Sequence, residues 1–175
     1  MTPPKNHIDT ASQEDLDLDQ ADRKFMALAL RLAKAAERKG EVPIGAVIVD
    51  KSGKILARSG NVREQTLSTL GHAELAVIHR ACRKLKSWRL IDCTLYVTLE
   101  PCFMCAGALV QARVGRVVFG THDPKAGAVE SLANIGADSR LNHRFEIKSG
   151  VLGDECAAIL KDFFKKKRKA KTVSS

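Results

Sequence analysis

The hydrophobic pattern along the first third of the chain predicts one helix followed by two strands. The helix is indicated by apolar residues at helical spacing, Phe25, Leu28, Ala29, Leu32 and Ala36. Asp19 is suited to cap the start of this helix, and Gly40 is suited to end it. Apolar runs at 46–49 and 55–57 predict two short strands, and the residues 50–53 between them predict the turn of a hairpin.

The rest of the chain alternates helical and strand patterns. A helix is predicted at 72–85 and a strand at 94–99. The later predicted elements are a helix that follows Pro101 and ends near 112, a strand at 116–119, a mainly irregular segment at 120–142, a strand at 144–148 and a helix at 154–167. This order predicts an α/β fold, a three-layer α/β/α sandwich with a central mixed five-stranded sheet.

Length and composition indicate one domain with two short terminal segments. The 175 residues, 45% of them hydrophobic, suffice for a single core. Residues 1–18 are polar and acidic and predict a disordered leader, 19–168 form the predicted domain, and 169–175 a basic flexible tail. We find no signal peptide and no run of apolar residues long enough to span a membrane. We therefore expect a soluble cytoplasmic protein.

The net charge of +9 is concentrated near the end of the chain. The basic residues gathered there are Lys165, Lys166, Lys167, Arg168, Lys169 and Lys171. A local basic block suits a polyanion, because each cation that neutralises a phosphate releases condensed counterions. Taken alone, the block fits a solvated solubility tail equally well.

One histidine and two of the five cysteines have the spacing of a metal site. Cys102 and Cys105 are three residues apart, so at the start of a helix both sulfurs point to one side. Together with His72 they supply three zinc ligands and leave a fourth position for water, which is typical of catalytic zinc. The remaining cysteines are scattered and give no disulfide framework.

Glu74 is the candidate catalytic residue beside this metal site. It follows His72 by two residues, roughly 200° around a helix, so the two side chains are poorly placed to bind one metal. We expect Glu74 to carry protons between water and the substrate instead.

Each half of this pattern has a simpler explanation. A single Cys-x-x-Cys is more often half of a structural zinc site, or two buried cysteines, and His79 or His143 would be candidates for a fourth ligand. His-x-Glu alone is common. The joint pattern of His-x-Glu followed by Pro-Cys-x-x-Cys is the known signature of zinc deaminases that act on nucleobases.

Beyond these motifs, residues 25–167 resemble the bacterial tRNA adenosine deaminases of the cytidine deaminase superfamily. The segments that carry the resemblance are 41–47, 89–92, 94–102, 104–108, 115–120, 142–144 and 162–164. The resemblance implies a cytidine deaminase-like fold and a homodimer that binds one Zn²⁺ per subunit through His72, Cys102 and Cys105. It also implies that Glu74 shuttles protons while the wobble adenosine of an arginine tRNA becomes inosine.

The same resemblance implies substrate-binding roles for Asn61, Asp123, Lys125, Phe164 and Lys167, the last two at the anticodon stem-loop. Asn61 and Asp123 also suit turns, and Phe163 fits the core better than an RNA surface, which leaves Phe164 as the exposed ring. The chain departs from the family pattern at 68–71, where it has Ser-Thr-Leu-Gly, and at Glu130, where a Gly is usual.

Two other functions remain open at this point. A deaminase of free nucleosides or of a base such as guanine would share the zinc site, but its small substrate has little use for a basic helix. A noncatalytic subunit could keep the zinc, but it would have no use for Glu74 beside the metal.

Overall fold

The computed structural model describes residues 12–173 and is built around a five-stranded sheet in the order β2-β1-β3-β4-β5. The strands are β1 (Gly45–Val49), β2 (Ile55–Gly60), β3 (Thr94–Leu99), β4 (Arg116–Thr121) and β5 (Glu146–Lys148). β1 is antiparallel to both β2 and β3, whereas β3, β4 and β5 are parallel to one another. The predicted mixed five-stranded sheet is confirmed.

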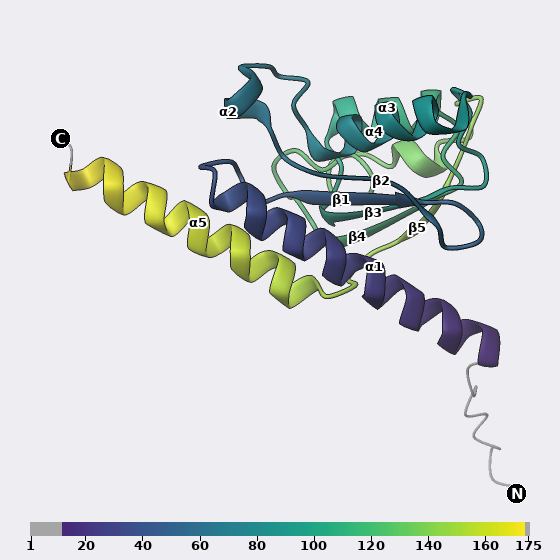
Figure 1. Ribbon diagram of the computed structural model, residues 1–175, viewed down its shortest axis with the longest axis horizontal. Helices are drawn as coiled ribbons and strands as arrows, with labels where there is room; N and C mark the ends of the chain where they lie inside the picture. Colours follow the sequence, from purple (N-terminus) through teal and green to yellow (C-terminus); the bar gives the residue numbers. More distant parts are fainter. Residues whose placement is uncertain (1–11, 174–175) are drawn as a thin grey trace, which may run out of the picture.

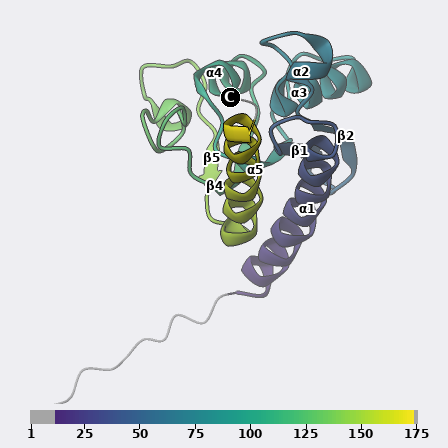
Figure 2. The same cartoon turned by 90° about the vertical axis from the view of Figure 1, so that its left-hand side faces the viewer.

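Helices cover both faces of this sheet (Figure 1). α1 (Gln13–Glu37) and α5 (Gly153–Val173) lie on one face, and α3 (Ala73–Leu85) and α4 (Phe103–Gln111) lie on the other. Figure 2, in which the left-hand side of Figure 1 faces the viewer, shows α1 and α5 side by side; α1 contacts β1 and α5 contacts β4. Two short helices, α2 (Arg63–Thr66) and η1 (Ile135–Ala137), lie in the connections. The predicted three-layer sandwich is therefore confirmed.

Alternate strand residues contribute to two separate cores. Ala46 and Ile48 pack with α3 and α4, whereas Val47 and Val49 pack with α1 and α5. Successive side chains of a strand point to opposite faces of the sheet. Because both faces are covered, the central strands are apolar at nearly every position, as the run in β1 illustrates.

The topology places the beginnings of α3 and α4 at the same edge of the sheet. β2 ends at that edge because it runs antiparallel to β1, and the chain then leads through α2 into α3. β3 is also antiparallel to β1, so it ends at the same edge, and α4 follows it directly. Two helix N-termini therefore meet beside the carboxyl end of β3.

The first helix begins earlier than the sequence predicted. Ser12, and not Asp19, caps α1: the Ser12 side chain accepts a hydrogen bond from the Asp15 backbone, and the Asp15 side chain accepts one from the Ser12 backbone. This capping box, with acidic residues in the first turn, stabilises the helix start. The predicted disordered leader is thus helical from Gln13 onward, and its residues 1–11 lie outside the described range.

The C-terminal helix is longer than predicted. α5 continues to Val173, so residues 169–173 of the predicted flexible tail are helical, while 174–175 lie outside the described range. Lys169, Ala170 and Lys171 have high helix propensity, and they follow an already formed helix without a break. Within residues 12–173 we find no helix whose length and hydropathy would let it cross a bilayer.

A buried carboxylate on α1 ties that helix to the sheet. Asp22 is fully buried; it accepts two hydrogen bonds from Arg116 at 2.7 and 2.9 Å and one from the Tyr96 hydroxyl at 2.9 Å. The Nζ of Lys148 lies 2.9 Å from the Oδ2 of Asp22. Burial raises the pKa of Asp22, but hydrogen bonds from Arg116 and Lys148 outweigh it and hold the pKa below 3.8.

We predict that Asp22→Asn lowers the free energy of unfolding by about 3 kcal/mol at pH 7, because it leaves the buried Arg116 without its anionic partner. The Asp22 carboxylate stabilises the fold above its unfolded-state pKa, and this contribution is lost as pH falls through the lower folded-state pKa. Urea unfolding should therefore show the difference between the two proteins shrinking below about pH 3.8. Asp17→Asn, on the exposed side of α1, should change little; a constant difference at all pH values would contradict this account.

Candidate active site

Three side chains meet where α3 and α4 begin. His72 is the N-cap residue of α3 and Cys102 is the N-cap residue of α4, and neither side chain caps its own helix. Both residues have extended backbone, which leaves their side chains free to turn toward one another. Cys105 lies in the first turn of α4 and joins them from the same side.

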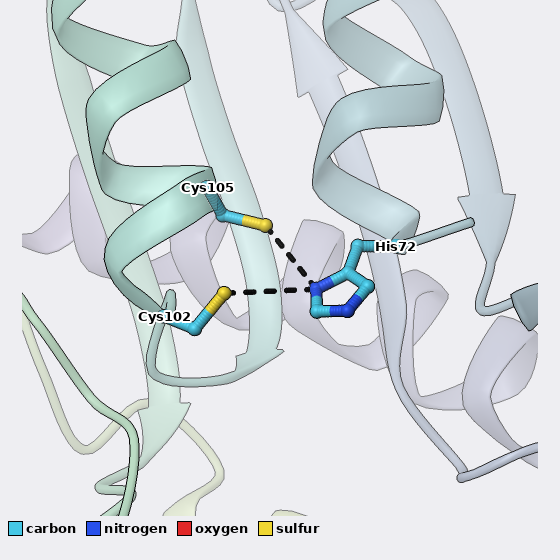
Figure 3. A group of neighbouring side chains, drawn as sticks. All are labelled: His72, Cys102 and Cys105. Carbon is cyan, nitrogen blue, oxygen red and sulfur yellow. Dashed lines mark hydrogen bonds between the residues drawn. The ribbon is translucent and has the colours of Figure 1, made fainter. Parts of the chain in front are cut away.

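The three side chains lie close enough to share one metal ion (Figure 3). The Nδ1 of His72 lies 3.4 Å from the Sγ of Cys105 and 3.7 Å from the Sγ of Cys102. All three potential ligand atoms lie within 4.8 Å of one another. One imidazole nitrogen and two sulfurs form a donor set that zinc favours and that hard cations such as Mg²⁺ do not.

The structure provides no fourth protein ligand within its described range. The group of metal-binding side chains there contains only His72, Cys102 and Cys105. His79 is exposed on α3, and the Nε2 of His143 lies 2.7 Å from the carbonyl oxygen of Val114. The arrangement therefore fits an open three-ligand site and not a closed structural one.

The electrostatics of the group favour a thiolate. Hydrogen bonds from Cys105 and His72 lower the pKa of Cys102 to about 4. The hydrogen bond to Cys102, together with burial, raises the pKa of Cys105, and the same Cys102 sulfur raises the pKa of His72. The N-terminus of α4 adds to this effect, because its free N–H groups stabilise negative charge.

Glu74 projects from the first turn of α3 with one oxygen unpartnered. The residue is 4% exposed, and its Oε2 is the one buried side-chain nitrogen or oxygen in the described range without a hydrogen-bond partner. Burial raises the pKa of Glu74, and His72, Cys102 and Cys105 are near enough to influence it. An orphaned buried oxygen is rare and points to a small polar group, such as water, that completes the site.

Comparison with known proteins assigns the chain to a family. The model of MafB19-like deaminases matches residues 20–168. The chain is 52% identical over 153 residues to a tRNA-specific adenosine deaminase of Bacillus subtilis, with 87% of this chain and 94% of that protein covered. This chain belongs to the tRNA-specific adenosine deaminase family. A tRNA-specific adenosine deaminase of Haemophilus influenzae is 42% identical, with 87% and 88% covered.

Solved structures agree with this family assignment. A chain from a study of A-to-I editing by tRNA:A34 deaminases superimposes with a TM-score of 0.75 at 46% identity, covering 78% of this chain and 99% of that one. A guanine deaminase from Nitrosomonas europaea gives a TM-score of 0.69 at 21% identity, covering 93% and 98%. At that identity, the second match shows the shared fold alone.

Asn61 lies in the segment that enters this deaminase site from β2. Its backbone N–H donates to the Ile44 carbonyl at 2.9 Å, and its side-chain Nδ2 donates to Glu41 at 3.2 Å. The residue is buried. The next residue, Val62, donates to the carbonyl of Gly71 at 2.8 Å, which joins this segment to the residue before His72. Asn61 is therefore held by Ile44 and Glu41 in a segment that is bonded to the residue before His72.

Asp123 and Lys125 follow β4 in the loop that the deaminase resemblance assigns to the substrate. The Oδ1 of Asp123 accepts hydrogen bonds from the backbone of Lys125 at 3.0 Å and of Ala126 at 3.2 Å, so Asp123 does form a turn. The Lys125 side chain is exposed. This loop and α5 enclose a groove of about 490 Å³, lined by Asp123, Pro124, Lys125, Leu160, Lys161, Phe164 and Arg168.

The aromatic pair on α5 divides as predicted. Phe163 is buried, whereas Phe164 is 45% exposed and lines the groove beside Arg168. The Nζ of Lys167 lies 5.6 Å from the centre of the Phe163 ring, so this lysine lies over the buried ring.

Glu100 organises the loop between β4 and η1, the predicted substrate loop, and sequence analysis missed this role. Its carboxylate accepts backbone hydrogen bonds from Asp123, Val129, Glu130 and Ser131 at 2.8 to 3.1 Å, and one from the Ser131 hydroxyl. Burial raises the pKa of Glu100, but these bonds outweigh it and lower the pKa to about 2. The sequence signal for this role was an acidic residue placed directly between an apolar strand and Pro-Cys. The signal does not identify the partners of Glu100, because they lie more than 20 residues away in the sequence.

The two departures from the family pattern make specific contacts. Gly71 packs so closely on α2 that an added Cβ would lie 2.7 Å from the Cα of Arg63. The carboxylate of Glu130 pairs with the Nε2 of His122 at 2.8 Å, across the start of the substrate loop. Neither departure adds a residue to the metal-binding group.

We predict that the purified protein contains one zinc ion per chain and that Cys105→Ala removes it, because two protein ligands hold zinc far more weakly than three. Elemental analysis of the dialysed proteins measures the metal content. Cys82→Ala is the matched control, since Cys82 is a half-buried cysteine outside the metal-binding group. Full zinc occupancy in Cys105→Ala would show that the ion is bound elsewhere.

Proposed function

We propose that this chain catalyses the hydrolysis of adenosine to inosine at the wobble position of a tRNA anticodon loop, with one zinc ion held by His72, Cys102 and Cys105. The observation that carries the proposal is the unpartnered Oε2 of Glu74 beside this metal-binding group. Such a pair of features is what nucleobase deamination requires. The 52% identity to a tRNA-specific adenosine deaminase supports the substrate class.

The residues present suit this chemistry. Zinc bound by two thiolates and a neutral imidazole would provide a water-derived nucleophile near neutral pH. Glu74 is buried, and this burial raises its pKa, which suits a carboxyl that takes up a proton and gives it back during turnover. Its Oε2 is the atom at which we place the proton during turnover.

Glu74 would move protons in two stages. It first accepts the proton of the water that attacks C6 of adenine and passes this proton to the ring nitrogen N1. It then takes the remaining proton of the new C6 hydroxyl and delivers it to the departing amine, so that the C6–N bond breaks, the C6 carbonyl forms and ammonia leaves. Adenosine and water thus give inosine and ammonia, and the carboxylate returns to its starting state.

The basic helix and the substrate loop would hold the RNA. The wobble base must leave its stack to reach a buried site, and an anticodon loop permits this at low cost. We propose that Asn61 binds the target nucleotide, that Asp123 and Lys125 contact its sugar-phosphate, and that Phe164 and Lys167 contact the anticodon stem-loop. The groove between the substrate loop and α5, with exposed Phe164 and Arg168, supports this path.

The assembly and the setting of the enzyme are further parts of the proposal. By resemblance to the bacterial enzymes, we expect a homodimer in which both subunits build the substrate groove, acting on an arginine tRNA in the cytoplasm. Exposed Phe103 at the start of α4 and exposed Leu132 in the loop before η1 are apolar side chains near the site that a second subunit would cover.

The alternative of a guanine-type deaminase has weaker support. Guanine deaminases of known structure from Nitrosomonas europaea and Bacillus subtilis are 21% and 31% identical to this chain, both below the 46% identity of the chain from the tRNA:A34 deaminase study. A small free base would also gain little from the exposed cations of α5. The noncatalytic alternative leaves the buried carboxyl of Glu74 without a purpose.

We predict that the purified enzyme produces inosine in tRNA and in an anticodon stem-loop, but leaves free adenosine and free guanine unchanged. Nucleoside analysis by liquid chromatography and mass spectrometry measures inosine and xanthine. Xanthine from guanine, with no inosine in tRNA, would favour the guanine-type alternative.

We predict that Glu74→Gln retains zinc and RNA binding but lowers kcat by at least about 100-fold, because the amide cannot accept the proton of water. Single-turnover kinetics with a stem-loop, together with elemental analysis, separate these effects. Glu64→Gln, an exposed glutamate on α2, is the matched control and should retain activity. Loss of zinc in Glu74→Gln would instead identify Glu74 as a ligand.

We predict that replacing Lys165, Arg168 and Lys169 with Ala weakens tRNA binding and lowers the dependence of log Kd on log salt by roughly 0.7 to 0.9 for each phosphate that is no longer neutralised. The control variant replaces Lys51, Lys54 and Lys86 with Ala, which removes the same charge at the edge of the sheet opposite the metal-binding group. Equal slopes in the two triple variants would show that α5 does not contact phosphates.

A further inference from the structure

Glu41, between α1 and β1, is a fully buried carboxylate whose hydrogen bonds all go to one short segment. Its Oε2 accepts from the Asn61 side chain at 3.2 Å and from the Glu64 backbone at 3.1 Å. Its Oε1 accepts from the Gln65 backbone at 2.8 Å and from the Gln65 side chain at 3.4 Å. One buried charge thus holds residues 61–65, which lead from β2 into α2.

The contact with Glu41 fixes which way the Asn61 amide points. An ionised carboxylate only accepts hydrogen bonds, so the group that faces Glu41 must be the amide nitrogen. Burial raises the pKa of Glu41, but the hydrogen bonds from residues 64 and 65 outweigh it and hold the pKa low, which keeps the carboxylate charged at neutral pH. The Oδ1 of Asn61 has no hydrogen-bond partner in the described range and is not fully enclosed, so it is the acceptor that the amide offers to a ligand.

The same segment is attached to the metal-binding group. Val62 donates to the Gly71 carbonyl at 2.8 Å, and Gly71 directly precedes His72. Gly71 also packs closely on the backbone of Arg63, within the segment that Glu41 holds. The position of Asn61 relative to His72 is therefore set by contacts on both sides of the segment.

We propose that Glu41 is a positioning residue that orients the Asn61 amide so that its Oδ1 acceptor is turned to the bound nucleotide. The inference rests on the proposed function and deepens it. Adenosine offers two kinds of donor to such an acceptor, its 6-amino group and its ribose hydroxyls, whereas its ring nitrogens N1, N3 and N7 only accept. The Oδ1 of Asn61 would therefore accept from one of those donors, and Glu41 would exclude the reversed amide, which would turn Oδ1 toward the buried charge.

The first test compares Glu41→Gln with Glu64→Gln, a matched substitution on the exposed side of the same segment. The amide of Glu41→Gln can turn its nitrogen toward Asn61 and so reverse the Asn61 amide. We expect kcat on an anticodon stem-loop to fall about 10- to 100-fold, with KM within about threefold, because the α5 cations are unchanged. Zinc content should stay at one per chain, and Glu64→Gln should match the wild type.

The second test exchanges the two functional groups. In the double variant Glu41→Gln with Asn61→Asp, the new amide can donate to the new carboxylate, which again presents an acceptor to the nucleotide. We expect the double variant to regain at least about tenfold in kcat over Glu41→Gln, although Asn61→Asp alone places two carboxylates together and loses activity. A double variant no better than Glu41→Gln would overturn the proposal, since a purely structural role for Glu41 predicts additive losses.

A readout without turnover separates this proposal from the proposed function. In the ¹H–¹⁵N spectrum of the zinc-bound protein, the Asn61 side-chain amide should be shifted by its bond to the charged Glu41, and this shift should disappear in Glu41→Gln but not in Glu64→Gln. An unshifted amide in the wild type would overturn the proposal whatever the activity. Absence of inosine from the wild type, with the amide shift present, would contradict the proposed function and not the orientation of Asn61.

Discussion

The molecule depends on one topological constraint: β1 lies between β2 and β3 and is antiparallel to both. This arrangement directs the chain into α3 and into α4 from the same edge of the sheet. His72 and Cys102 can then both be N-cap residues, with side chains that turn toward each other and away from their own helices. The free N–H groups of α4 stabilise a thiolate there before any metal binds.

Two buried carboxylates fix the two segments of chain that follow β2 and β4. Glu41 holds the segment that enters from β2, and Glu100 holds the loop that follows β4. Each accepts from several backbone N–H groups that a loop near a pocket would otherwise leave without partners. A buried charge without hydrogen bonds is energetically costly. Each segment is therefore most stable in the conformation in which its N–H groups donate to the carboxylate. The start of α2 and the loop that follows β4 are consequently held in place by these two carboxylates.

Local patterns predicted most of the fold, and long-range contacts account for what they missed. The strand predicted at 94–99 is β3 with the same bounds. The three candidate ligands come together because each lies at the start of a helix that follows a predicted strand. The cap at Ser12 was missed because the acidic composition of residues 1–18 predicted a disordered leader, and the capping box between Ser12 and Asp15 lies inside that segment. Glu41 and Glu100 were missed because nothing in their neighbourhood shows that segments 20 to 31 residues away donate to them. Charge inside an apolar stretch is a signal for such a role, but it does not identify the partners.

The extension of α5 past its last buried ring determines how far the enzyme can reach. Beyond Phe163 the helix continues to Val173, and at about 1.5 Å per residue this carries its cations about 15 Å outward at a fixed spacing. Lys165 and Lys169 are one turn apart and repel each other, which favours fraying of the free end. A phosphate backbone laid along the helix would cancel that repulsion, so the stiffness of this arm would itself depend on whether RNA is bound.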